Sequence, residues 1–394
     1  IILMENAAHA VSRVIAERLG GSVKGKSILI LCGKGNNGGD GAALARVLWE
    51  QHADVDVVIV GKIDEMTGDA KVNFEFLRAL SEGDGMFIDH WEVQDFGAFY
   101  ELKEGFLSRV PIEFVVDALF GTGLTRPLNP PFDGIVDNIS KWILHQKKIP
   151  VLSVDIPSGL AADLCTKVGP TVHAETTVTF TAPKVGNIIP PASHFNGELV
   201  VAHIGSPEGL LDEQSSDLFI TESYDVQCWL LKSEFSGDSY KNKRGHALLI
   251  AGSENYSGAA VLAGNAAMRS GVGLVTIGTP KSSKDAIASR VVPEVMVRPL
   301  EETGSGSVSE DAIKEIEKFS KSVDAIAIGS GLSTDESTAK FVRHFVEKRR
   351  MPTILDADAL TLLSPFPKDW PPANAGGSDL ILTPHEGEFL RLLG

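Results

Sequence analysis

Short, continuous runs of apolar and β-branched residues recur along this chain, and they constrain its fold more than any other feature. In the first half the runs occupy residues 27–32, 54–61, 114–121, 151–159, 176–183 and 198–205. Strands that are covered on both faces have this continuous pattern, whereas strands with one face in water alternate apolar and polar residues. Segments 41–51 and 73–83 have helical patterns and separate the strands. The sequence therefore predicts an α/β fold with a parallel or mostly parallel sheet.

A second series of apolar runs follows a region of weaker pattern between residues 206 and 244. That region is predicted to hold a linker and a helix around 223–231. The second series comprises residues 246–253, 273–279, 295–300, 324–331, 353–360 and 379–385. A length of 394 residues is typical of two to three domains, and the second series does not repeat the first at a fixed spacing. We therefore predict two different three-layer αβα domains, residues 1–220 and 221–394.

The charge of the chain argues against polyanionic partners. Its 36 basic and 52 acidic residues give a net charge of −16, which provides no electrostatic footprint for nucleic acid or an anionic membrane. No apolar run approaches the roughly 18 residues that suggest a membrane span. We therefore expect neither a nucleic-acid partner nor a membrane, and we expect a homo-oligomer that binds a small molecule.

The cysteines and the first residue bear on the compartment. Cys32, Cys165 and Cys228 are widely spaced and form no CxxC motif, which predicts free thiols in a reducing compartment and not a disulfide framework or a zinc site. Cytoplasm or an organellar matrix is expected. Because Ile1 opens the chain inside a helical pattern, we expect the natural N-terminus, with any targeting segment, to lie outside this sequence.

The most informative motif, at residues 32–41, reads CGKGNNGGDG and follows the first predicted strand. Part of it fits GxGxxG, but a dinucleotide cofactor also needs an acidic residue at the end of the next strand, about 20 residues later. That strand ends in Gly61 and Lys62. No GK[ST] follows the glycines, so a P-loop is excluded as well. The motif alone therefore argues against a hydride-transferring cofactor.

A tight strand-to-helix turn, with Asp40 as the N-cap of a helix that starts at Gly41, is the structural alternative. It leaves the adjacent Asn36 and Asn37 unexplained. Backbone amides at a helix N-terminus suit a phosphate or another anion, and the carboxyl end of a strand in an open α/β sheet is where ligands bind. We therefore favour a ligand site, although this motif does not identify the ligand.

Two further predicted strands end in polar residues. Asp117 lies in one strand and precedes a second glycine loop, residues 121–127, while Asp155 ends another strand before a Pro-Ser-Gly turn. Either aspartate alone could be a structural cap. Three polar strand ends at one sheet edge indicate a site, and the oxygen-bearing side chains of Asn37, Asp117 and Ser158 suit a hard cation better than zinc or copper.

Four segments in this order resemble the NAD(P)H-hydrate epimerase family: LMENAA, CGKGNNGGDG, VVDALFGTGLTRP and VDIPSG. The resemblance covers about residues 1–220 and implies a Rossmann-like domain that interconverts the R and S forms of hydrated NADH or NADPH. It implies potassium ligands at Asn37, Asp117 and Ser158. The implied substrate contacts are Asn36, Asn37, Gly38, Gly39, Asp40, Gly121, Thr122, Gly123, Leu124, Thr125, Arg126, Pro127 and Asp155.

The chemistry of that reaction points to one proton-exchanging group. Hydration leaves a hydroxyl on the ring carbon next to nitrogen, and the two forms can exchange by loss and re-addition of water or by ring opening. Either route needs a proton donor-acceptor near the hydroxyl. Asp155 is the candidate general acid/base, a role typically worth ~10²–10⁴ in rate.

The second half resembles the ADP/ATP-dependent NAD(P)H-hydrate dehydratases. The matching segments are RGHALLIAGS, SGAAVLAGNAAMRSGVG, PEVMVRPL, IAIGSGLS, LDADAL and TPHEGEF. The resemblance implies a ribokinase-like fold, with Ala259, Gly331 and His385 contacting the hydrated nucleotide. It also implies ADP or ATP with magnesium, bound by a glycine-rich segment that we expect beyond Gly394, so the second domain is expected to be incomplete.

The segment TPHE, residues 383–386, predicts a capping box with Thr383 as N-cap, Pro384 as first helical residue and Glu386 at the third position. His385 would then lie in the first helical turn. A solvated histidine near a helix cap is the alternative to a ligand contact.

The leading interpretation is a bifunctional enzyme that repairs hydrated NAD(P)H. Two alternatives remain at this point. One is a ribokinase-like kinase for a small alcohol with a regulatory first domain. The other is a non-catalytic module that senses a nucleotide or binds a partner.

Overall fold

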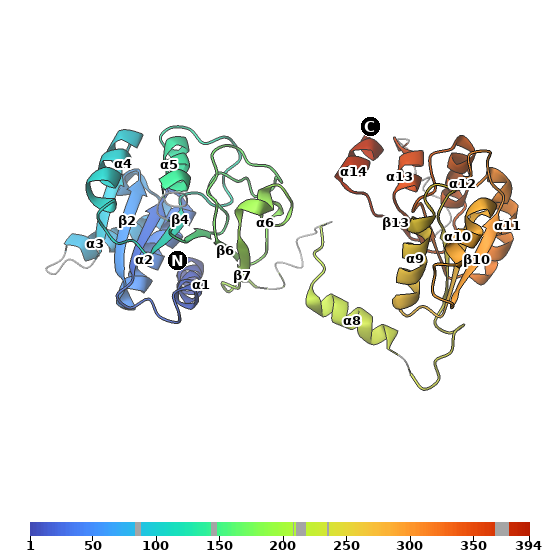
Figure 1. The fold of residues 1–394 in the computed structure, drawn as a ribbon. Coiled ribbons are helices and arrows are strands. Elements are labelled where there is room, and N and C mark those ends of the chain that lie inside the picture. The colour runs from blue at the N-terminus through green and yellow to red at the C-terminus, as the bar shows by residue number, and fades with distance from the viewer. Residues whose placement is uncertain (83–87, 143–147, 208, 210–217, 235, 367–377) are drawn as a thin grey trace. The chain divides into compact units, whose positions relative to one another are not determined.

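The computed structural model describes residues 1–82, 88–142, 148–207, 209, 218–234, 236–366 and 378–394 (Figure 1). The chain divides into two compact units, Ile1–Asp217 and Leu218–Gly394, and each unit has its own parallel sheet. No helix in the described ranges is long and apolar enough to span a bilayer.

The first unit is built on a seven-stranded sheet in the order β3-β2-β1-β4-β5-β6-β7, with every described pairing parallel. The strands are β1 (Ser27–Cys32), β2 (Asp54–Val60), β3 (Asp89–Val93), β4 (Phe114–Ala118), β5 (Val151–Val154), β6 (Thr176–Phe180) and β7 (Glu198–Ala202). All six predicted runs form strands. Strand order reverses between β1 and β4, and this switch point is where open α/β sheets bind ligands.

Strand β3 was not predicted, because its sequence DHWEV is polar. It pairs only with β2, at the edge of the sheet. A strand at an edge has one neighbour and keeps much of its surface in water, so it does not need the apolar run that marks the central strands.

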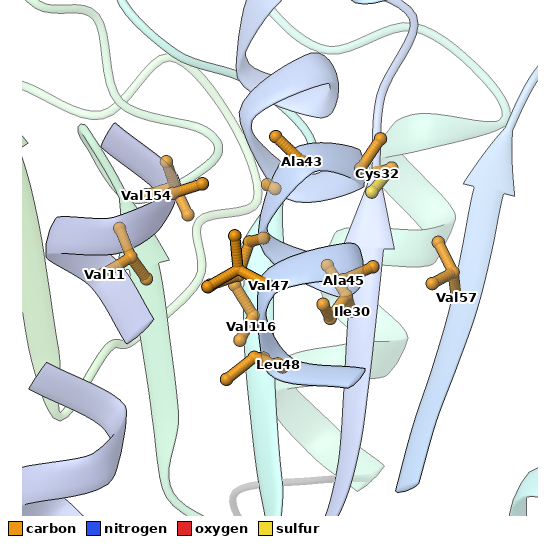
Figure 2. Close-up of a cluster of buried hydrophobic side chains, with 14 of the residues drawn as sticks. Val11, Ile30, Cys32, Ala43, Ala45, Val47, Leu48, Val57, Val116 and Val154 are labelled. Atoms are coloured by element: carbon orange, nitrogen blue, oxygen red, sulfur yellow. The ribbon is translucent and has the colours of Figure 1, made fainter. Parts of the chain in front are cut away.

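Helices cover both faces of this sheet, as the continuous apolar strands predict. Helices α1 (Ile2–Arg18), α2 (Asn36–Glu50) and α3 (Gly68–Glu82) pack on one face, and α4 (Phe96–Leu102) and α5 (Phe132–Ile139) on the other. Figure 2 shows Val11 of α1 beside Val154 of β5, and Val47 of α2 beside Val116 of β4, in the same buried cluster. Burying a valine side chain stabilises the fold by about 1.5–3 kcal/mol, so these clusters hold α2 firmly over the switch point.

The second unit has a six-stranded parallel sheet in the order β10-β9-β8-β11-β12-β13. Its strands are β8 (His246–Ile250), β9 (Leu274–Pro280), β10 (Val295–Leu300), β11 (Ala325–Ile328), β12 (Thr353–Leu355) and β13 (Leu380–Leu382). Its helices are α8 (Ser223–Ser233), α9 (Ser257–Arg269), α10 (Lys284–Ala288), α11 (Ile313–Phe319), α12 (Glu336–Glu347), α13 (Asp358–Leu363) and α14 (Glu386–Leu393). Two buried clusters, one on each side of the sheet, complete the layers. The predicted run 353–360 is divided between β12 and α13.

Candidate active site at the carboxyl ends of the strands

The motif at residues 32–41 forms the end of β1 and the start of α2. Helix α2 begins at Asn36, with Gly35 as its N-cap, and no side chain in the described residues caps it. The predicted helix start at Gly41 and the predicted N-cap Asp40 are therefore wrong, because Asp40 lies inside the helix. The uncapped N–H groups of the first turn remain available to an anion.

Three glycines explain why the helix can start so early. A Cβ atom on Gly38 would lie 1.8 Å from the carbonyl oxygen of Gly33, and one on Gly41 would lie 2.7 Å from the sulfur of Cys32. A Cβ on Gly39 would lie 2.8 Å from the Cα of Ala70 in α3. Packing is therefore sufficient to explain why these positions are glycine. The predicted substrate contacts of Gly38 and Gly39 stay predictions.

Asn37 joins the first glycine loop to the second. Its side chain is buried, and neither its amide oxygen nor its nitrogen has a hydrogen-bond partner in the part of the chain that the structure describes. A Cβ on Gly121 would lie 3.4 Å from the amide oxygen of Asn37. Leaving a buried polar group unpaired costs about 1–3 kcal/mol, so this amide calls for a bound partner.

The rest of the second glycine loop faces water. Leu124 is the exception, since its side chain belongs to the buried cluster on the α4–α5 face. The residues exposed at this edge are Thr122, Gly123, Thr125, Arg126 and Pro127. Of the two glycines in this loop, Gly121 lies against Asn37 of the α2 motif, whereas a Cβ on Gly123 would meet no described atom within 4 Å. The other predicted loop contacts stay predictions.

Asp117, at the end of β4, is fully buried and hydrogen-bonded. Its Oδ2 accepts the hydroxyl of Ser153 at 2.8 Å and the backbone N–H of Ser158 at 2.9 Å. Its Oδ1 accepts the hydroxyl of Ser158 at 2.6 Å. Burial raises the pKa of Asp117, although the hydrogen bonds from Ser158 and Ser153 oppose that shift. The structure therefore brings the predicted pair Asp117 and Ser158 into direct contact.

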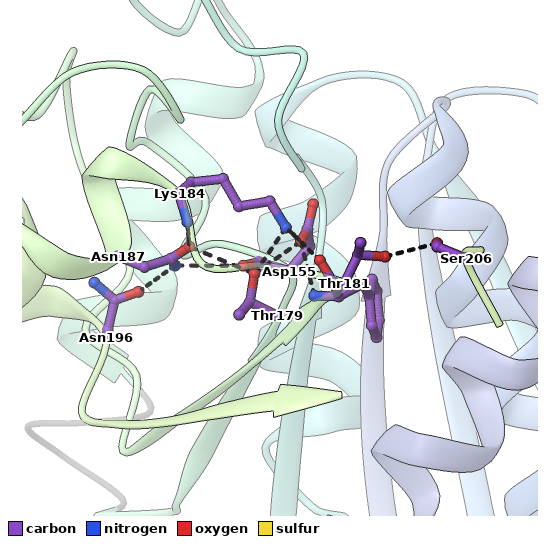
Figure 3. Close-up of polar contacts among 8 residues, drawn as sticks. Asp155, Thr179, Thr181, Lys184, Asn187, Asn196 and Ser206 are labelled. Carbon is purple, nitrogen blue, oxygen red and sulfur yellow. Dashed lines mark hydrogen bonds and ion pairs between the residues drawn. The ribbon is translucent and has the colours of Figure 1, made fainter. Parts of the chain in front are cut away.

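Asp155 follows β5 in the left-handed region, with φ of 67°. Its Oδ1 accepts the hydroxyl of Thr179 at 3.1 Å and the backbone N–H of Phe180 at 3.4 Å, and it forms an ion pair with Lys184 (Figure 3). A non-glycine residue held in this region is strained, and such residues cluster at functional sites.

Asp40 and Asp155 interact electrostatically although they come from different elements. Burial, and after it the negative charge of Asp155, raises the pKa of Asp40 to about 8. With this pKa, the carboxyl group of Asp40 is mostly protonated at pH 7. Asp40 and Asn36 also line a cavity of about 730 Å³ together with Phe180 and the first residues of α1. This cavity lies beside the predicted proton-exchanging group.

The second unit shows the same arrangement of polar strand ends. A Cβ on Gly331, after β11, would lie 2.9 Å from the Cβ of Ala259 on α9, so these two predicted contacts are neighbours. The carboxylate of Asp356, after β12, accepts the hydroxyl of Ser330 at 3.3 Å and that of Thr383 at 2.8 Å. Asp356 thereby joins the loops that carry Gly331 and His385.

The predicted cap of α14 is wrong in its register. The N-cap is His385, whose Nδ1 accepts the backbone N–H of Gly387 at 3.1 Å, and Glu388 occupies the third position. Thr383 does not cap the helix: its hydroxyl donates to the carboxylate of Asp356, and the described N–H groups of the first turn donate to His385 instead. His385 is thus a capping residue at the sheet edge, which agrees with the structural alternative and leaves its ligand contact a prediction.

Sequence reasoning missed three residues beside Asp155: Thr179, Lys184 and Asn187. Thr179 lies in β6, Lys184 is the N-cap of the short helix α6 (Val185–Ile188), and Asn187 lies in that helix. The position of Lys184 and Asn187 after the fifth apolar run is the same signal that identified Asp155. The predicted strand ends at residue 183, so Lys184 is the first polar residue after it, and its position alone could have marked it as a candidate site residue.

Each unit has a parallel sheet with glycine turns and polar side chains at the carboxyl ends of its strands. This arrangement is that of a two-domain α/β enzyme that acts on nucleotide-like substrates. Residues 1–186 match the family described as YjeF-related protein N-terminus, and residues 247–394 match the family described as NAD(P)H-hydrate dehydratase. The chain belongs to the bifunctional NAD(P)H-hydrate repair enzymes.

Relatives of that name resemble the chain along its whole length. The enzyme Nnr of Moorella thermoacetica is 35% identical, covering 100% of this chain and 71% of the relative. That of Thermofilum pendens is 36% identical, covering 100% and 70%. Agreement over both units supports one bifunctional family.

Two solved structures resemble one part of the chain each. Yeast ynu0 is 27% identical, covers 57% of this chain and 87% of its own, and has a TM-score of 0.42. The ADP/ATP-dependent NAD(P)H-hydrate dehydratase from Bacillus subtilis, co-crystallised with ATP/Mg2+, is 36% identical, covers 40% and 50%, and has a TM-score of 0.30. With TM-scores below 0.5, neither likeness defines the fold by itself.

Proposed function

We propose that the first unit interconverts the R and S forms of hydrated NADH and NADPH, and that the second unit belongs to the dehydratase that returns the S form to NAD(P)H. Family membership supports the repair function over a small-alcohol kinase or a nucleotide sensor. One observation carries the assignment of the first unit: Asp155 is held after β5 by Thr179, Phe180 and Lys184, at the same end of the parallel strands as the uncapped start of α2.

Asp155 exchanges the proton in this proposal. On the ring-opening route, its carboxylate takes the hydroxyl proton, the bond from the ring carbon to nitrogen breaks, and the electron pair goes to nitrogen. Rotation of the resulting aldehyde and re-closure on the opposite face give the other form, and the proton returns to oxygen. On the water-loss route, Asp155 first donates a proton to the leaving hydroxyl and recovers it from the water that adds to the other face. Both routes balance with one acid/base.

The uncapped N–H groups of α2 hold the negatively charged phosphates of the nucleotide in this proposal, since they carry partial positive charge. Asn36 and Asp40, which line the neighbouring cavity, contact the rest of the substrate. The proposed contacts are those the sequence predicts: Asn36, Asn37, Gly38, Gly39, Asp40, Gly121, Thr122, Gly123, Leu124, Thr125, Arg126, Pro127 and Asp155.

The first unit also holds a potassium ion in this proposal, at Asn37, Asp117 and Ser158. The orphaned amide of Asn37 supports the fit, because its buried oxygen has no partner among the described residues and would gain one from a cation. Oxygen donors of this kind suit a hard ion. When bound, the ion would supply positive charge that favours the ionised form of Asp117, whose pKa burial raises.

In the second unit we assign the hydrated nucleotide to Ala259, Gly331 and His385, and we assign ADP or ATP with magnesium to the dehydratase as phosphate donor. The contact between Ala259 and Gly331 at the end of β11 supports a shared binding surface. A homo-oligomer and a location in the cytoplasm or an organellar matrix stay predictions.

The epimerase assignment is tested by following purified R-hydrate of NADPH by chromatography in potassium buffer. The chain should bring R and S to equilibrium at least 100-fold faster than buffer alone. An R-to-S rate equal to that of buffer would contradict the assignment. For the second unit, S-hydrate should raise the unfolding temperature, and Gly331→Val should remove that increase because its side chain would collide with Ala259 and Tyr256.

A further inference from the structure

The two carboxylate oxygens of Asp155 have different environments. Oδ1 accepts the hydroxyl of Thr179, the backbone N–H of Phe180 and the ammonium of Lys184. Oδ2 has no hydrogen-bond partner among the residues that the structure describes. The carboxylate is therefore held by one oxygen, and the other is left to exchange a proton.

All three N–H donors of the Lys184 ammonium are used in hydrogen bonds within the protein. A lysine ammonium has three N–H donors, and Nζ of Lys184 contacts Oδ1 of Asp155, the hydroxyl of Thr179 at 2.8 Å and the carbonyl of Phe180 at 3.1 Å. The side chain of Lys184 is only 19% exposed. With every donor used inside the protein, Lys184 has none left for the substrate.

Backbone strain on both sides shows that the surroundings hold these residues in place. Asp155 after β5 and Thr181 after β6 both have positive φ, 67° and 68°. Each is the centre of a tight turn: the N–H of Ile156 donates to Val154 at 2.9 Å, and that of Ala182 donates to Phe180 at 2.7 Å. Strained residues of this kind persist only where several contacts determine them.

The side-chain amides of Asn187 and Asn196 hold the backbone of Lys184 in place (Figure 3). The amide oxygen of Asn187 accepts the backbone N–H of Lys184 at 2.8 Å, and its nitrogen donates to Asn196 at 2.9 Å. The same nitrogen lies 3.4 Å from the carbonyl of Asp155. Asn187 thus ties the backbones of Asp155 and Lys184 to each other.

We propose that Lys184 is a positioning residue for epimerisation: it clamps Oδ1 of Asp155 and presents Oδ2 to the substrate hydroxyl. This inference rests on the proposed function of the first unit. Lys184 itself donates no proton to the substrate.

The test compares Lys184→Met and Lys184→Arg with the wild-type chain by R-to-S conversion across pH. We expect Lys184→Met to lower kcat about 10- to 100-fold, below the full effect of losing an acid/base, with KM within about three-fold. Lys184→Arg should recover most of kcat, because the guanidinium can still donate to Oδ1 of Asp155.

The control is Lys26→Met, since Lys26 also pairs with a carboxylate, Glu113 at 2.7 Å, but precedes β1 at the opposite edge of the sheet. It should leave kcat and the pH–rate profile unchanged. If Lys184→Met does not fold, Thr179→Val tests the inference in its place. This variant removes one hydrogen-bond donor from Oδ1 of Asp155 and should lower kcat several-fold at unchanged KM.

The inference is overturned if Lys184→Met, or Thr179→Val in its place, keeps wild-type kcat, or if Lys184→Arg recovers none of the lost kcat. It is also overturned if the basic limb of the profile disappears in Lys184→Met, since Lys184 would then be the proton donor. A wild-type chain that does not epimerise at all would instead refute the proposed function, so the two failures are distinguishable.

Discussion

Ser158 donates both its backbone N–H, at 2.9 Å, and its hydroxyl, at 2.6 Å, to the carboxylate of Asp117, which lies 41 residues earlier in the chain. Both side chains are fully buried. The pair joins the end of β4 to the turn after β5, and the same hydroxyl accepts the backbone N–H of Phe120 at 2.9 Å. The loop that starts the second glycine segment is therefore fixed by Ser158.

Asp117→Ala should lower the free energy of unfolding of the first unit by about 3 kcal/mol, because it leaves buried donors of Ser153 and Ser158 without acceptors. Denaturant unfolding followed by circular dichroism measures the change. Asp64→Ala is the matched control, since Asp64 pairs with Arg78 on the surface at 3.0 Å and should cost no more than about 1 kcal/mol. Equal, small effects of both variants would contradict a structural role for Asp117.

Potassium should raise the unfolding temperature of the first unit relative to tetramethylammonium at equal ionic strength. Asn37→Ala should remove this difference, because it deletes the unpaired amide oxygen. Asn138→Ala is the control: Asn138 of α5 also has a buried, unpartnered amide oxygen among the described residues but is not a proposed ligand. A potassium effect that persists in Asn37→Ala argues against the proposed ion site.

Asp155→Asn should lower the rate of R-to-S conversion at least 100-fold, since an amide cannot exchange a proton at neutral pH. The substitution preserves size, so substrate binding measured by thermal shift should remain. Chromatography of the two hydrates measures the conversion. An Asp155→Asn rate within a few-fold of wild type would remove Asp155 from the acid/base role.

Asp40 should make the first unit less stable as pH rises from about 4 to about 8. Its folded-state pKa of about 8 lies above the ordinary value of 3.8 for an aspartate, so the folded state binds more protons in this window and stability falls by at most about 1.4 kcal/mol per pH unit. Asp56 contributes in the same direction up to its raised pKa of about 6. Above pH 6 the slope should therefore come mainly from Asp40.

Asp40→Asn provides the comparison, because the amide imitates the protonated carboxyl group and does not titrate. Thermal unfolding of both proteins between pH 6 and 8 should show a decline in the wild-type chain that is much smaller in Asp40→Asn. Parallel curves would mean that Asp40 ionises normally in the folded state.

Gly41→Ala should destabilise the first unit by about 1–3 kcal/mol through overpacking, because its Cβ would lie 2.7 Å from the sulfur of Cys32 and 2.8 Å from Ala118. Gly123→Ala is the control, since a Cβ there meets no described atom within 4 Å. It should leave the unfolding temperature unchanged. If both substitutions are equally tolerated, the start of α2 is less tightly packed than its contacts imply.

The sequence predicted the central strands because burial on both faces requires continuous apolar runs. It could not predict the start of α2, because Asn and Gly disfavour helix. Packing contacts such as that of Gly39 with Ala70 in α3 override that preference, and a single sequence does not show them. The cap of α14 was misassigned for a related reason. The hydroxyl of Thr383 is bound to Asp356, 27 residues away in sequence, and short-range rules do not contain that partner.

For the candidate site, the sequence predicted Asp117, Asp155 and Ser158 because polar residues at strand ends interrupt an apolar pattern. The environment of Asp155 was not predictable. Its partner Lys184 lies 29 residues later, in the segment after β6, the strand that neighbours β5 in the sheet. Which end residues meet depends on strand pairing, and a single sequence does not specify that pairing.

The clamp on Asp155 has a consequence for how this protein acquires its activity during synthesis. The switch-point motif of α2 emerges first, whereas Lys184 belongs to the segment after β6 and follows Asp155 by a full strand. Non-local parallel pairings of this kind form slowly. A nascent chain that has completed β5 but not β6 would carry the acid/base without the ammonium that orients it. Epimerase activity would therefore appear only when β6 pairs with β5. The time at which activity appears would then report the time of that pairing step.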